Sequence, residues 1–193
     1  IKEVRKDGLA VAFENAGHDG CTAGNYLPKF FGGLSAATME AYTDHGDWAL
    51  EPSFTTDWVR AAMKANPDRQ RPFWLAAEWL APPPNRFGYM LQAVARRVEG
   101  TSYPFPDKWT HRMDGIVGNI VTFLKGYGAV QPFVEVEPDI AILCSFDQMA
   151  VNLRAIYDYH ACYYELTRAQ YPPQCIYQET VARGGLMNSG IKV

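Results

Sequence analysis

The stretch 71–84 reads RPFWLAAEWLAPPP and contains the most strand-like segment of this chain. An apolar run from Phe73 to Ala77 predicts a buried strand, and the carboxylate of Glu78 follows it directly. Trp79 comes next, and three prolines soon afterwards end any regular strand. The stretch thus predicts a strand that brings one acidic side chain to its own carboxyl end. From the residues alone, Glu78 is either a catalytic carboxylate or an ordinary charge at a strand end.

Apolar runs and helical stripes alternate along the whole chain around this stretch. Strands are predicted at 9–13, 36–42, 72–77, 98–103, 139–147, 172–181 and 190–193, and helices at 54–66, 86–97, 108–125 and 151–169. This alternation predicts an α/β architecture with parallel sheets. The segment 128–138 reads as a linker, which divides the chain into a unit at 1–127 and a second unit at 139–193.

The sequence also predicts a helix cap, the burial of one strand and the environment of one histidine. Thr55 or Thr56 is a candidate cap for the helix at 54–66, because threonine side chains accept hydrogen bonds at helix starts. The continuous apolar run at 139–147 predicts a strand buried on both faces. On the helix at 151–169, the side of Ile156 and Tyr163 also carries His160, which predicts a core histidine.

The composition argues against a nucleic-acid-binding protein and against a membrane-spanning one. The 193 residues carry a net charge of −3, with 18 basic and 21 acidic side chains that are scattered rather than clustered. The sequence therefore predicts no nucleic-acid partner, and its apolar runs are too short for a membrane span. The N-terminal IKEVRKDG does not resemble a signal peptide.

Neither the cysteines nor any short motif of the sequence predicts a metal site, a cofactor site or a disulfide framework. The four cysteines form no CxxC pair, so we expect buried thiols, with Cys144 and Cys175 in strands and Cys162 in a helix. A compartment cannot be assigned, although the thiols favour a reducing, cytoplasmic one. His45 lies between Asp44 and Asp47 without a second histidine nearby, and no nucleotide or nucleophile-elbow motif is present, so we expect no metal and no cofactor.

Polar or aromatic residues follow the first four predicted strands. In parallel α/β structures functional groups gather at the carboxyl ends of strands. Hydroxyl-binding and stacking side chains at these ends are typical of a carbohydrate site. Besides Glu78, the candidate substrate contacts are Glu14, His45, Trp79 and Tyr103. Trp79 is about as well explained by packing against the following prolines.

The order of several short segments resembles glycoside hydrolase family 42, the β-galactosidases and their retaining relatives. RPFWLAAEW resembles the end of the seventh barrel strand in that family, and MLQAVARRVEGTSYPF (90–105) is similar to its eighth-strand region. IAILCSFDQMAV (140–151), YYELTRAQYPPQCIY (163–177) and SGIKV (189–193) resemble the opening of the family's flavodoxin-like domain.

The resemblance implies a specific fold and chemistry. The chain would hold strands five to eight of a (β/α)₈ TIM barrel and the start of a flavodoxin-like, glutamine-amidotransferase-like domain. Glu78 would be the nucleophile. The family's acid/base lies in an Asn-Glu pair, which this sequence lacks, so that carboxyl group is expected outside the chain. The rest of the same polypeptide or a companion chain would supply it, and we expect a homo-oligomer. PFPDKW replaces the aromatic ending that the family has after its eighth strand, which leaves galactose specificity open.

Three readings follow. The first is a retaining glycoside hydrolase of the β-galactosidase type. The second is a non-catalytic carbohydrate-binding or assembly protein that keeps the barrel architecture. The third is an unrelated α/β enzyme in which the order of segments is coincidental. A second carboxyl group facing Glu78 would separate the first reading from the second.

Overall fold

The computed structural model describes residues 11–14, 36–41, 50–65, 73–77, 88, 92, 95–96, 98, 100–102, 115, 118–119, 122, 125–126, 138–152, 154–186 and 191. Its strands are β1 (Val11–Glu14), β2 (Ala36–Ala41), β3 (Phe73–Ala77), β4 (Gly100–Ser102), β5 (Ala141–Cys144) and β6 (Gln174–Tyr177). Its helices are α3 (Glu51–Lys64), α6 (Phe146–Val151), α7 (Ala155–Arg168) and α8 (Gln178–Ala182).

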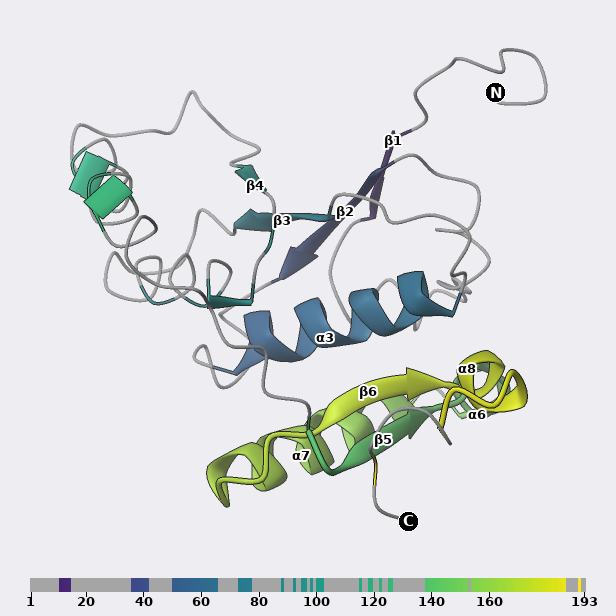
Figure 1. Ribbon diagram of the computed structural model, residues 1–193. Coiled ribbons are helices and arrows are strands. Elements are labelled where there is room, and N and C mark those ends of the chain that lie inside the picture. The colour runs from purple at the N-terminus through teal and green to yellow at the C-terminus, as the bar shows by residue number, and fades with distance from the viewer. Residues whose placement is uncertain are drawn as a thin grey trace, which may run out of the picture.

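β1 to β4 form a four-stranded sheet in which every neighbouring pair is parallel (Figure 1). The strand order β1-β2-β3-β4 follows the chain order, so β2 and β3 are the inner strands. All four lie within or next to the predicted strand segments. β5 and β6 form a second, two-stranded parallel sheet. The prediction of an α/β structure with parallel sheets is therefore confirmed.

Helix α3 begins earlier than the sequence pattern predicted, and its cap differs. The helix starts at Glu51 after Leu50, which makes no side-chain cap, and Pro52 lies in its first turn. Proline suits this position because its fixed φ fits a helix and its missing N–H would have no partner there. The prediction of a threonine cap is therefore wrong. Thr55 and Thr56 are buried within the helix, and the Thr56 hydroxyl donates to the Pro52 carbonyl at 2.7 Å.

Two further predicted helices are described only in part. Residues 88, 92 and 95 are helical, and the Arg96 amide donates to the Gln92 carbonyl at 3.0 Å. In the predicted helix at 108–125, residues 115, 118, 119, 122 and 125 are helical and exposed. The apolar stripe predicted for the other side of that helix lies outside the described residues.

The strand at 139–147 was predicted to be longer and more buried than it is. β5 ends at Cys144, and its side chains alternate between the core and the surface, with Leu143 50% exposed. Only the face of β5 that carries Ile142 and Cys144 is buried, so the expectation of burial on both faces is wrong. The Ser145 hydroxyl accepts from the Gln148 amide at 3.3 Å and caps α6.

The remaining C-terminal helix and strand are of the predicted types, but their lengths differ from the predicted ones. Ile156, His160 and Tyr163 of α7 are buried on one side of the helix, as predicted. β6 ends at Tyr177, and the residues predicted to continue the strand form α8 instead. The strand predicted at 190–193 falls almost wholly outside the described residues.

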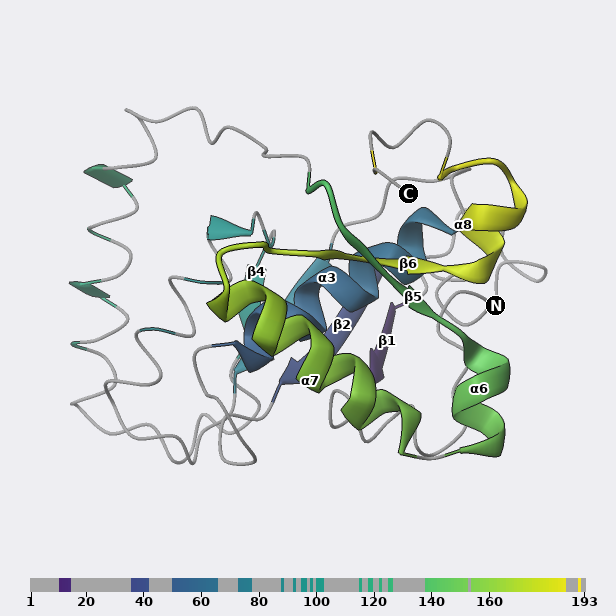
Figure 2. The same cartoon turned by 90° about the horizontal axis from the view of Figure 1, so that it is seen from below.

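Helix α3 lies between the two sheets (Figure 1). Seen from below, β5, β6 and α7 cover its near side (Figure 2). The Trp58 and Phe54 side chains of α3 are completely buried in one hydrophobic cluster with side chains of the small sheet. The core members are Phe54, Trp58, Val59, Ala61, Ala62, Ala65, Ile142, Cys144, Met149, Ala155, Ile156, Tyr159, Tyr163, Cys175 and Tyr177. This cluster joins residues from both sides of the predicted linker, while the domain boundary itself stays a prediction.

Candidate functional site

The four parallel strands of the large sheet end at one edge, and this edge is the predicted site. The last residues of β1, β2, β3 and β4 are Glu14, Ala41, Ala77 and Ser102. Of the predicted site residues, only Glu14 lies within a described element, as the last residue of β1 in register with Met39. Glu78, which follows Ala77 in the sequence, lies outside the described residues, as do His45, Trp79 and Tyr103.

The sheet register fixes the backbone of Glu14 relative to the end of β3. Glu14 is level with Met39, which is level with Leu75, whereas β3 ends two residues later at Ala77. Strands lie about 4.8 Å apart and rise about 3.3 Å per residue, so the Cα atoms of Glu14 and Ala77 are about 12 Å apart. The register thus places the ends of β1 and β3 at the same edge of the sheet, two strands apart.

A polar junction in the described structure is built on Asp57, which the sequence did not single out. The Asp57 carboxylate accepts a hydrogen bond from the Arg96 guanidinium, and the same oxygen accepts one from the Tyr163 hydroxyl at 2.5 Å. The Asp57 and Arg96 side chains are 18% and 26% exposed, so water screens this ion pair only partly. One carboxylate thus ties α3 to α7 and to the chain that precedes β4.

The charges at this junction agree with the hydrogen bonds. Burial lowers the pKa of Arg96, but the negative charge of Asp57 and its hydrogen bond outweigh burial and leave that pKa raised. The pKa of the Tyr163 phenol is raised, first by burial and then by the charge of Asp57. Both donors therefore keep their protons at neutral pH. The junction is a fixed ion pair with a neutral phenol rather than an acid–base pair.

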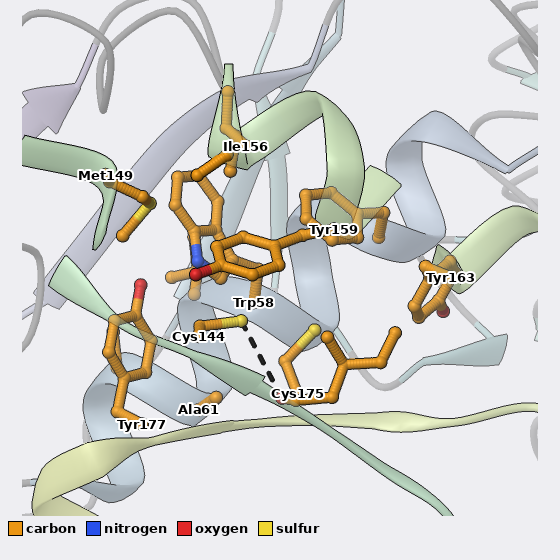
Figure 3. Close-up of a cluster of buried hydrophobic side chains, with 14 of the residues drawn as sticks. Trp58, Ala61, Cys144, Met149, Ile156, Tyr159, Tyr163, Cys175 and Tyr177 are labelled. Carbon is orange, nitrogen blue, oxygen red and sulfur yellow. Dashed lines mark hydrogen bonds between the residues drawn. The ribbon is translucent and has the colours of Figure 1, made fainter. Parts of the chain in front are cut away.

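Two thiols lie on the inner face of the small sheet, under the aromatic cluster (Figure 3). Cys144 pairs with Tyr177 and Ile142 pairs with Cys175, so the two cysteines are diagonal neighbours. Both are buried and form no disulfide, as predicted. Cys162 is exposed, so the expectation of a buried thiol is wrong for this residue. A hydrogen bond with Cys144 and burial both raise the pKa of the Cys175 thiol, so this cysteine is poorly suited to nucleophilic attack.

A hydrogen-bonded network lies at the carboxyl ends of β5 and β6. Ser145 follows β5 and donates from its hydroxyl to the Gln178 side-chain carbonyl at 3.0 Å. The Ser145 amide donates to the Tyr159 hydroxyl at 3.2 Å, which donates in turn to the Gln148 side-chain carbonyl at 2.9 Å. An amide oxygen is not a base, so it does not activate the Ser145 hydroxyl as a nucleophile. The spacing Ser145-x-x-Gln148 is a capping signature and was the sequence signal for this network.

His160 completes the titratable groups of the core. The centroid of its ring lies 3.9 Å from the centroid of the Phe54 ring. Its Nδ1 atom lies 3.4 Å from the Tyr164 hydroxyl oxygen. The residue is 8% exposed. These contacts agree with the predicted core histidine.

The described part of the chain contains no cluster of three or more metal-ligating side chains. Nor does any helix within it have the length and apolar character needed to span a membrane. Comparisons with protein-family models, curated proteins and solved structures give no match for this chain. The resemblance to β-galactosidases thus stays a prediction that rests on the sequence segments.

Proposed function

We propose that this chain is part of a retaining glycoside hydrolase that acts on β-linked sugars, with Glu78 as its nucleophile. The observation that carries the proposal is the position of β3. It is an inner strand with parallel neighbours on both sides, and Glu78 is the next residue after its carboxyl end. Inner strands of parallel sheets deliver catalytic groups at this end.

The arrangement of strands and helices supports the barrel part of the proposal. The strand order follows the chain without the reversal that marks a doubly wound sheet. Ser53 of α3 contacts Gln92, and Asp57 contacts Arg96, so both pairs have the same sequence offset. Equal offsets mean that α3 and the helical segment around Gln92 run side by side in the same direction. Parallel neighbouring helices outside consecutive parallel strands are expected for half of a (β/α)₈ barrel.

The parallel pair β5–β6, connected through α7, supports a flavodoxin-like beginning for the second unit. Within this chain, the proposed mechanism uses side chains of the first unit only. The Glu78 carboxylate would attack the anomeric carbon as a facing acid protonates the leaving oxygen, and the same group would then activate water. That facing carboxyl group is proposed to come from outside this chain, about 5–5.5 Å from Glu78. Glu14, His45, Trp79 and Tyr103 are the proposed contacts to sugar hydroxyls and to the apolar sugar face.

A substrate with a very good leaving group tests Glu78 even where the acid/base group is missing. Fluoride leaves without protonation, so a 2-deoxy-2-fluoro-β-galactosyl fluoride needs only a nucleophile to form a glycosyl ester. The carbon–fluorine bond at the anomeric carbon breaks, fluoride leaves, and the carboxylate oxygen forms the new bond. The slow hydrolysis of the fluorinated ester lets mass spectrometry locate it.

We expect the label on the peptide that contains Glu78 and none in the Glu78→Gln protein. Glu165→Gln is the matched control, because the Glu165 side chain is 74% exposed and forms a surface ion pair with Arg168 on the same helix. Labelling that persists in Glu78→Gln would contradict the assignment. Binding of galactosides without any labelling would favour the carbohydrate-binding or assembly protein, and absence of both would favour an unrelated α/β enzyme.

A further inference from the structure

The Asp57 carboxylate joins three separated parts of the chain at one point. It belongs to α3, and its hydrogen-bond donors come from Arg96, just before β4, and from Tyr163 in α7. The Tyr163 side chain is completely buried, and its ring packs edge-on against Phe54 at 5.3 Å between centroids. The carboxylate is therefore held from the C-terminal unit on one side and holds Arg96 on the other.

Arg96 lies in the segment that leads from Glu78 to β4. A second contact, Ser53 to Gln92, fixes the same segment one helical turn earlier. Since Ser53 and Asp57 are four residues apart on α3, and Gln92 and Arg96 are four residues apart on the partner segment, the two contacts form a ladder between parallel helices. Sliding one helix along the other would break both contacts at once.

We propose that Asp57 is a positioning residue that transmits the packing of α7 to the segment between Glu78 and β4. Its consequence at Glu78 rests on the function proposed above. The Tyr163 hydroxyl orients the carboxylate, the carboxylate fixes Arg96, and Arg96 with Gln92 holds their helical segment against α3. The C-terminal unit thereby contributes to the geometry of a site to which it supplies no side chain.

Two tyrosines on α7 give a matched pair of variants. Tyr163→Phe removes the hydroxyl that binds Asp57 and keeps the buried ring. Tyr159→Phe removes a hydroxyl from the same helix and the same core, but that hydroxyl binds Ser145 and Gln148 instead. Both variants keep nearly the same volume, so a difference between them reports the Asp57 contact rather than packing.

Amide hydrogen exchange over residues 88–102 tests the coupling without any substrate. A hydrogen bond to a charged acceptor orders both partners, so Tyr163→Phe should speed exchange of the Arg96 amide about tenfold. Tyr159→Phe should leave that segment unchanged. Equal exchange in the two variants would overturn the proposal, whatever the function of Glu78.

The rate of labelling with the fluorinated galactosyl fluoride is a second measurement. It would not change if Asp57 only stabilised the fold. Tyr163→Phe should lower the maximal labelling rate of Glu78 several-fold more than Tyr159→Phe, at a similar half-saturating concentration. If the wild-type protein is labelled and the two variants have equal maximal labelling rates, the positioning role is overturned. A wild-type protein that does not label contradicts the proposed function, and the exchange result then decides the coupling alone.

Discussion

Replacing Trp58 by alanine should loosen the C-terminal unit, although Trp58 belongs to the first. The indole is completely buried in the cluster that also contains Cys144 and Cys175 (Figure 3). Truncating a buried tryptophan to alanine costs about 3–5 kcal/mol, which is a large part of the stability of a typical domain. If the units share one core, that loss lowers the free energy of opening at both cysteines.

Thiol alkylation under native conditions, resolved by peptide, measures this opening. When the core opens and closes faster than the thiols are alkylated, the labelling rate follows the population of the open state. A loss of 3–5 kcal/mol should therefore accelerate labelling of Cys144 and Cys175 by about two to four orders of magnitude. The exposed Cys162 should react quickly in every variant and serves as the internal reference. Val151→Ala is the control, because Val151 is 87% exposed. A Trp58→Ala protein with a lower melting temperature and unchanged protection of Cys144 and Cys175 would refute the shared core.

Three further predictions concern the small sheet and α7. First, Cys144 and Cys175 should not form a disulfide under oxidised glutathione, because diagonal positions on parallel strands separate their Cα atoms by about 8 Å, beyond disulfide reach; a linked peptide pair containing both cysteines in a non-reducing digest would contradict this. Second, Ser145→Ala should lower the free energy of unfolding in urea by about 1 kcal/mol through loss of the α6 cap, and an unchanged midpoint would refute that. Third, burial raises the pKa of Tyr163 in the folded protein. Stability should thus be level below the unfolded value near pH 10 and fall above it by up to about 1.4 kcal/mol per pH unit for this phenol. Tyr163→Phe should make that decline shallower, and an identical slope would contradict the burial of the phenol.

Local patterns predicted the element types well and their ends poorly. The apolar runs located β1 to β4, and the alternation with helices predicted the parallel sheets. The start of α3 was missed because the apolar stripe begins at Phe54, whereas Pro52 extends the helix by one turn without adding to the stripe. β5 was predicted too long because an apolar run does not reveal where Ser145 caps a helix.

The partners of the predicted elements could not be derived from periodicity. Nothing in the sequence near Asp57 shows that Arg96 and Tyr163 approach the same carboxylate, because both lie far away along the chain. Helical spacing fixes which face of α3 is apolar, but it does not identify the sheet that covers that face. The candidate sugar site was predicted from strand ends and a resemblance, and of its residues only Glu14 lies within the described part of the chain, so the site stays a prediction.

The separation of carboxyl groups around Glu78 in the assembled protein distinguishes a retaining glycosidase site from an ordinary strand end. A crystal structure of the protein after reaction with the fluorinated galactosyl fluoride would show both the ester and its surroundings. We predict a glycosyl ester on Glu78 and a second carboxyl group about 5–5.5 Å away, supplied from outside residues 1–193. An unmodified Glu78 paired with a basic side chain, with no carboxyl group within about 6 Å, would contradict it.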